Sequence, residues 1–159
     1  MPRARSHLVP AAVAVLAAGA AVLTAPAANA DPTFGQGQTI ALSAPVPSGW
    51  LVDSQNPAAG TKHIEYLGGA IFGAQVYVLP NQAAPANWVL AGVYPSGTAI
   101  LQYLGGVIPN GITQTMDQSC QTSIGTVWGY SAPAYWIVTG GGNDGICDYK
   151  SLRYSPRPY

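Results

Sequence analysis

Residues 60–71 read GTKHIEYLGGAI, and residues 97–108 repeat seven of these twelve positions without a gap, in the sequence GTAILQYLGGVI. A one-residue gap extends the match back to Trp50 in the first copy and to Trp88 in the second. Similarity at a fixed separation is typical of chains built from repeated structural units. We therefore predict an internal repeat of two copies, with a third copy around Trp128 as an extension. The alternative is chance similarity between Gly-rich and Ala-rich segments.

The residues in and around these segments alternate in the way that β-strands require. Residues 62–67 and 74–79 place polar and apolar side chains on opposite faces, and the glycines between them predict a hairpin. A second hairpin is predicted from residues 135–139 and 146–152. The 19 Gly and 14 Pro recur too often for long helices. We predict a mainly β fold, an antiparallel sheet in a sandwich or barrel-like form, with at most one or two short helices.

Residues 98–107 leave an alternative fold open, because Ile100, Leu101 and Leu104 also have helical spacing. In addition, the segment 39–80, which carries VPSGW at residues 46–50 between two expected strands, resembles the opening of PsbP-like α+β domains. That resemblance implies an α+β fold with a helix near 98–107. A helix there would make the match between the two copies accidental.

The first thirty residues have the features of an export signal. A short basic region with Arg3 and Arg5 precedes an apolar stretch over 10–24, and Ala28-Asn29-Ala30 fits the pattern that signal peptidase accepts. The apolar stretch is shorter than the roughly 20 residues that a membrane span needs. We expect cleavage after Ala30, a single globular domain over 31–159, and no membrane span in the product. The leader resembles those of small secreted actinobacterial proteins, which implies a protein that is extracellular or associated with the cell envelope.

Cys120 and Cys147 are the only cysteines, and an oxidising compartment favours a disulfide between them. After cleavage His63 would be the only histidine, which is too few nitrogen and sulfur ligands for a zinc site. We therefore expect no metal and no cofactor. We also expect Trp50, Trp88 and Trp128 to fill the core, since tryptophan is highly buried on average.

The charges predict the kind of partner. Residues 31–159 carry four Lys and Arg against six Asp and Glu, so a nucleic-acid partner is not expected. Three of the four cations lie in the last eleven residues, interspersed with tyrosines that suit sugars and protein surfaces. The candidate binding residues are Tyr149, Lys150, Arg153, Tyr154 and Arg157. The expected partner is an anionic polymer of the cell envelope or another protein.

Two functions follow from these observations. The first is a secreted, non-enzymatic binding or interaction protein, acting at the cell envelope or outside the cell. The alternative is a small secreted hydrolase in which His63 is the base, oriented by Asp53 or Glu65. Ser123 is its candidate nucleophile, although the surrounding sequence contains only half of the Gly-x-Ser-x-Gly motif.

Overall fold

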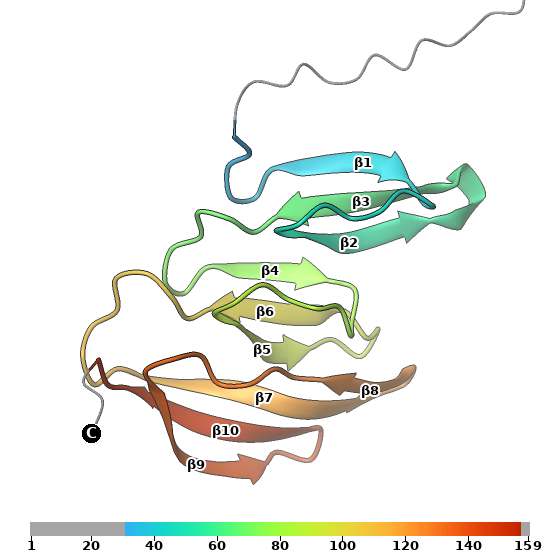
Figure 1. Ribbon diagram of the computed structural model, residues 1–159. Coiled ribbons are helices and arrows are strands. Elements are labelled where there is room, and N and C mark those ends of the chain that lie inside the picture. Colours follow the sequence, from blue (N-terminus) through green and yellow to red (C-terminus); the bar gives the residue numbers. More distant parts are fainter. Residues whose placement is uncertain (1–30, 157–159) are drawn as a thin grey trace, which may run out of the picture. The chain divides into compact units, whose positions relative to one another are not determined.

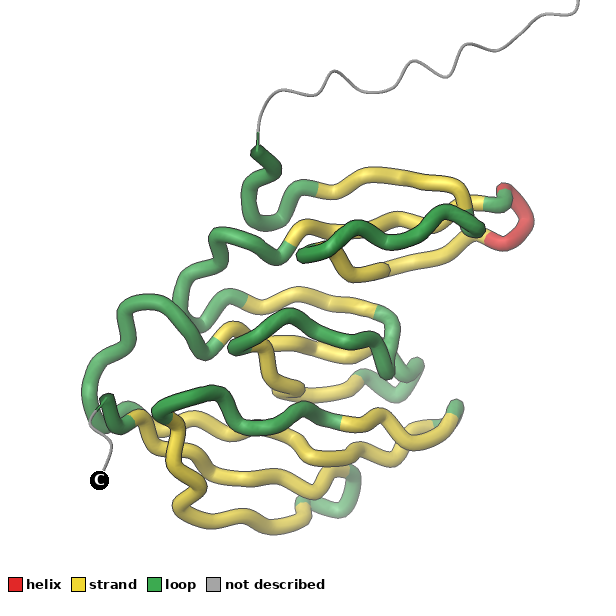
Figure 2. Tube along the Cα trace, viewed as in Figure 1, coloured by secondary structure: helices red, strands yellow, loops and turns green. Residues whose placement is uncertain are grey.

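The computed structural model describes residues 31–156, so the predicted export signal and Arg157 lie outside the described residues. The described chain forms three antiparallel sheets and a single 3-10 turn at Pro57–Ala59 (Figures 1 and 2). Their strands are β1 (Gly37–Ala41), β2 (Trp50–Asn56) and β3 (Thr61–Tyr66); β4 (Gln75–Val78), β5 (Trp88–Val93) and β6 (Ala99–Tyr103); and β7 (Thr113–Thr122), β8 (Gly125–Trp128), β9 (Trp136–Asn143) and β10 (Cys147–Tyr154). The prediction of a mainly β fold is confirmed, and the sheets do not close into a barrel. No helix of the described part is long and apolar enough to cross a membrane.

The three sheets share one strand order. In each sheet the third strand lies between the first and the second, giving β1-β3-β2, β4-β6-β5 and β7-β10-β9, with β8 added beside β7. The hairpin of every sheet also contains a bulge at the same place, which leaves one residue of its first strand unpaired. These residues are Asp53, Ala91 and Thr139. Because the registers agree, the residues of the three sheets correspond to one another position by position.

The local contacts agree with this correspondence. Each hairpin begins with a tryptophan whose N–H donates to a proline carbonyl three residues earlier, at Pro47, Pro85 and Pro133. Each tryptophan ring contacts the tyrosine opposite it, with ring centroids 5.3 to 5.4 Å apart. The pairs are Trp50 with Tyr66, Trp88 with Tyr103 and Trp136 with Tyr154. The residue before each tryptophan has a positive φ, which explains why Gly49 and Asn87 occupy two of these positions.

Three expectations from the sequence are wrong. The alternative helix near 98–107 is strand β6, the central strand of its sheet, because pairing with β4 and β5 overrides the helical spacing. The hairpin predicted from 62–67 and 74–79 does not form, since β3 and β4 belong to different sheets. Trp128 is not in the core: it lies on the short edge strand β8 and is 64% exposed, whereas Trp136 is 6% exposed. The predicted C-terminal hairpin is confirmed as β9 and β10.

The core lies where one sheet packs against the next. In the first junction, Phe34, Leu51 and Leu67 of the first sheet pack with Trp88 and its apolar neighbours in the second. In the second junction, Phe72, Val89 and Leu104 of the second sheet pack with Trp136 and its neighbours in the third. The three residues named from the first sheet correspond in position to the three named from the second sheet. Each of the first two sheets therefore offers one apolar face to the tryptophan of the sheet that follows it in the chain.

The predicted disulfide is confirmed. Cys120 of β7 and Cys147 of β10 are directly opposite each other, their sulfur atoms are 2.00 Å apart, and both residues are buried in the core. The bond therefore crosslinks the two central strands of the third sheet.

Candidate ligand-binding site on the third sheet

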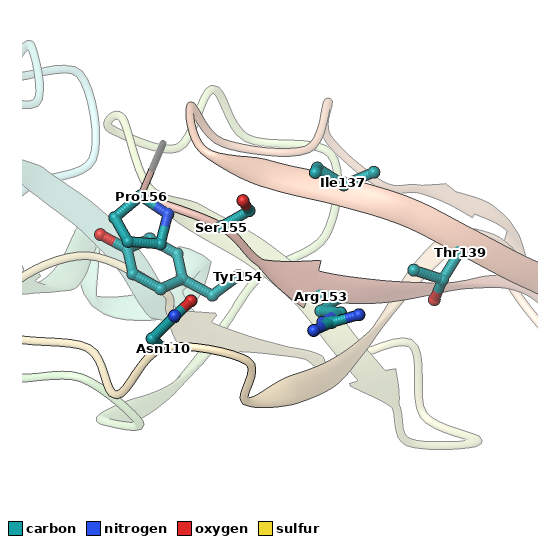
Figure 3. A pocket seen from close by; sticks show the side chains of 7 residues that line it. All are labelled: Asn110, Ile137, Thr139, Arg153, Tyr154, Ser155 and Pro156. Carbon is teal, nitrogen blue, oxygen red and sulfur yellow. The ribbon is translucent and has the colours of Figure 1, made fainter. Parts of the chain in front are cut away.

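A cavity of about 410 Å³ lies on the third sheet, at one end of β9 and β10 (Figure 3). Figure 3 shows Ile137 and Thr139 on β9 and Arg153 on β10. The cavity has four other lining residues. Asn110 lies before β7, Tyr154 ends β10, and Ser155 and Pro156 follow it. We call this cavity the third-sheet pocket. Its size lies within the range of cavities that bind small molecules.

The third-sheet pocket occupies the position of a junction that no sheet of residues 31–156 fills. Asn110 corresponds to Phe34 and Phe72, since each precedes a glycine whose N–H donates to the tyrosine carbonyl at the end of the sheet. In the same way Ile137 corresponds to Leu51 and Val89. Leu51 is 4% exposed and Val89 is fully buried, whereas Ile137 is 39% exposed. The pocket therefore lies on the face of the third sheet that corresponds to the tryptophan-holding face of each of the other two sheets.

Polar residues replace several apolar ones on this face. Asn110 stands where the other sheets have phenylalanine, and Ser155 stands where they have Leu67 and Leu104. No other sheet of residues 31–156 covers this face, and an uncovered sheet face needs polar side chains. This requirement explains a loss of apolar residues, but it does not require a cation. Arg153 of the third sheet corresponds to Glu65 and Gln102, so the pocket also gains a positive charge.

Arg153 can bind an anion in this pocket. Its side chain is exposed, and no acidic side chain of residues 31–156 forms a salt bridge with it. A guanidinium group offers paired N–H donors that match the oxygens of a carboxylate or phosphate. Bonds of this kind are stronger than those between neutral groups. Arg153 is therefore the residue of the pocket that can form a salt bridge with an anionic ligand.

The structure separates the residues of the site that the sequence predicted. Arg153 and Tyr154 line the third-sheet pocket, whereas Tyr149 lines a different cavity. Alternate residues of a strand point to opposite faces, so Lys150 and Tyr154 share one face of β10, and Tyr149 and Arg153 share the other. Tyr154 also packs on Trp136. Arg157 lies outside the described residues.

The predicted site did not include five of the lining residues: Asn110, Ile137, Thr139, Ser155 and Pro156. A signal for the first of them exists. Phe34-Gly35, Phe72-Gly73 and Asn110-Gly111 recur every 38 residues, and this period marks Asn110 as the counterpart of two phenylalanines. Ile137 and Thr139 carry no comparable signal, because an apolar residue and a hydroxyl residue on a strand are common in any β protein.

His63 forms part of a second polar cluster, on the first sheet. Its Nδ1 atom lies 2.6 Å from Asp53 Oδ2, and Ser54 Oγ donates to the other oxygen of Asp53 at 3.0 Å. Burial, and then the charge of Asp53, raise the pKa of Glu65, while His63 lowers it. Ser123 is not part of this cluster, since its hydroxyl donates to the carbonyl of Pro95. The structure brings together a histidine and a carboxylate but not the predicted nucleophile.

A third polar group is Asp117 on β7, in a cavity of about 610 Å³ that Asp144 also lines. Asp117 is 9% exposed, and burial, followed by the charge of Asp144, raises its pKa to about 6. Cys120 Sγ lies 3.6 Å from Asp117 Oδ2, but a disulfide sulfur carries no hydrogen to donate. Asp117, Cys120 and Cys147 lie close enough to hold an ion, yet sulfurs that are joined to each other are not thiolate ligands.

Comparison with known proteins found no match among family models, curated proteins or solved structures. The chemistry of the candidate site is therefore derived from its own residues. The third-sheet pocket combines one cation with two apolar residues, an amide, two aliphatic hydroxyls and a tyrosine. These groups can hold an anionic ligand in a fixed orientation, but they do not include the paired acid and base that catalysis requires.

Proposed function

We propose that the protein is an exported, non-enzymatic binding protein that acts at the cell envelope or outside the cell. Its ligand carries an anionic group, which contacts Arg153 in the third-sheet pocket. The observation that carries this proposal is an exposed arginine in a cavity without a salt-bridge partner among residues 31–156. The disulfide is compatible with an oxidising compartment, and the leader sequence supports export. Acidic polysaccharides and acidic protein surfaces are the partner classes that fit.

Replacing Arg153 by glutamine, the residue at the corresponding position of the second sheet, should weaken anion binding by about 10-fold or more, because a hydrogen bond to a charged group contributes about 1.5–3 kcal/mol. Retention of the protein on immobilised polygalacturonate and polyglutamate, measured across a salt gradient, checks this expectation. Lys150→Gln is the matched control, since it removes one positive charge from the same strand but from its other face. Equal loss of retention in both variants, or in neither, would contradict a site at Arg153.

The internal repeat is also a proposal. We infer that the three sheets are copies of one structural unit, because strand order, bulge position and the tryptophan–tyrosine pairs agree in all three. The third copy then contains Trp136 in place of Trp128. If this is correct, substitution of Trp136 costs far more stability than substitution of Trp128. Similar losses from both substitutions would argue against the third copy.

A hydrolase that uses His63 is the second candidate, and the short His63–Asp53 contact is the observation that favours it. A base also needs a nucleophile within hydrogen-bond reach, and no hydroxyl of residues 31–156 hydrogen-bonds to this histidine. We therefore expect His63→Gln to hydrolyse p-nitrophenyl butyrate at the same rate as the wild type. Circular dichroism establishes that the variant is folded. A loss of about 100-fold or more in a folded variant would support the hydrolase instead.

A further inference from the structure

The two filled junctions show what this kind of face holds. Trp88 stacks on Phe34 with centroids 6.1 Å apart and an interplanar angle of 26°, and Trp136 stacks on Phe72 at 6.2 Å and 14°. Both indoles are almost fully buried. The Trp136 Nε1 atom also donates to the carbonyl of Leu104 at 3.0 Å. Each junction thus buries an indole ring against an aromatic ring and aliphatic side chains.

The third-sheet pocket keeps part of this construction and changes the rest. Ile137 retains the aliphatic position. Tyr154 also lines the pocket, but its ring packs on Trp136 of the same sheet, as Tyr66 packs on Trp50 and Tyr103 packs on Trp88. Asn110 adds an amide, and Arg153 adds a positive charge that neither filled junction has at the corresponding position. A guanidinium group also stacks favourably on aromatic faces. The pocket therefore suits a flat ring more polar than the tryptophans of the two junctions.

We propose that the third-sheet pocket binds an aromatic ring that carries a carboxylate. The ring takes the position that Trp88 and Trp136 take in the junctions, and the carboxylate contacts Arg153. This inference rests on the proposed function and names its ligand class. The same chemistry occurs in a free aromatic acid and in the C-terminal aromatic residue of a peptide, so both are tested. A second copy of the chain fits less well, because the amide of Asn110 and the guanidinium group of Arg153 would then be removed from water.

The first measurement compares four probes by isothermal titration calorimetry with the full chain. These are acetate, indole, indole-3-acetate and the peptide Gly-Gly-Trp with a free carboxylate. Indole-3-acetate should bind at least about 10-fold more tightly than acetate, because the ring adds apolar burial and an aromatic contact. The Arg153→Gln variant should reduce this affinity to that of indole. Tighter binding of Gly-Gly-Trp than of indole-3-acetate would identify a peptide as the source of the ring.

The second measurement restores the junction phenylalanine. In Asn110→Phe the new ring occupies the position of Phe34 and Phe72, so the affinity for indole and indole-3-acetate should rise about 2- to 10-fold, as an added aromatic pair predicts. The affinity for acetate should not change. Asn110→Leu is the matched control, since it adds apolar volume without a ring and should give a smaller gain. Circular dichroism and gel filtration establish that both variants are folded and monomeric.

The outcomes separate this inference from the proposal on which it rests. If acetate and indole-3-acetate bind equally while Arg153→Gln still loses retention on the acidic polymers, the aromatic ligand is wrong and the anion site stands. If Arg153→Gln keeps both its retention on the acidic polymers and its affinity for indole-3-acetate, both proposals fail. A smaller gain for Asn110→Phe than for Asn110→Leu would also overturn the assignment of an aromatic ring to this pocket. A concentration-dependent dimer of the wild type that cannot bind indole-3-acetate would assign the pocket to a second copy instead.

Discussion

Trp136→Ala is expected to lower the free energy of unfolding by about 3–5 kcal/mol, the usual cost of removing a large buried aromatic side chain. The substitution removes the stacking with Phe72, the contact with Tyr154 and the hydrogen bond to the carbonyl of Leu104. It also leaves a cavity in the core of the third sheet, because the ring is only 6% exposed. Urea unfolding at neutral pH, followed by circular dichroism, measures the loss.

Trp128→Ala is the control for this experiment. The ring of Trp128 is 64% exposed, and its backbone N–H bond to Asn81 is retained in the alanine variant. Its effect should be within about 0.5 kcal/mol of zero, as for other surface substitutions. The two tryptophans are eight residues apart, so the comparison tests the position of the third copy directly. Equal effects would show that Trp136 is not held by a junction of the kind that holds Trp88.

Asp117→Asn should stabilise the protein by about 3 kcal/mol at pH 7 and change its stability little at pH 4. The pKa of Asp117 in the folded protein is raised from 3.8 to about 6, first by burial and then by the charge of Asp144. Each unit of pKa difference corresponds to about 1.4 kcal/mol. Below pH 3.8 the carboxyl is protonated in both the folded and the unfolded chain, so it imposes no penalty. Between pH 4 and 6 the folded state binds more protons, and its stability therefore falls as the pH rises.

The measurement is urea unfolding of the wild type and the variant at intervals between pH 4 and 7. The variant cannot ionise at this position, so its stability should not show the decline between pH 4 and 6 that Asp117 causes. Asp31→Asn is a suitable control, because Asp31 is exposed. Parallel pH profiles of the wild type and Asp117→Asn would show that the buried carboxyl is not responsible for the decline.

Most of the fold class could be predicted from the sequence, since alternation of side chains and frequent Gly and Pro act locally. The likeness of the first two sheets was also detectable, because Tyr66-Leu67-Gly68-Gly69 and Tyr103-Leu104-Gly105-Gly106 are identical in sequence. The third sheet escaped this comparison for two physical reasons. Its outer face is polar, so Ser155 and Pro156 replace the leucine and the first glycine. The β8 hairpin also lengthens the unit, which moves its tryptophan to 48 residues after Trp88 and leaves Trp128 as a misleading match at 40.

The candidate site was less accessible to prediction than the fold. Arg153 and Tyr154 were identified from charge and aromatic content, but composition does not show that neighbouring residues of a strand face opposite ways once the strand is paired. The pocket also depends on Asn110, which is more than forty residues from Arg153 in the sequence. The pairing of β7 with β10 brings the first residues of the third sheet close to its last residues. Long-range pairing of this kind has no local signal.

The stacking of each phenylalanine on the tryptophan of the following sheet also affects the order in which the sheets can be completed. Phe34 meets Trp88 only 54 residues further along, and Phe72 meets Trp136 after 64 residues. During synthesis the N-terminus emerges first. The apolar face of the first sheet therefore stays exposed until Trp88 of the second sheet has been made. Such long-range contacts form slowly and leave apolar surface exposed meanwhile. The corresponding face of the third sheet instead carries Asn110, Arg153 and Ser155, so it exposes less apolar surface.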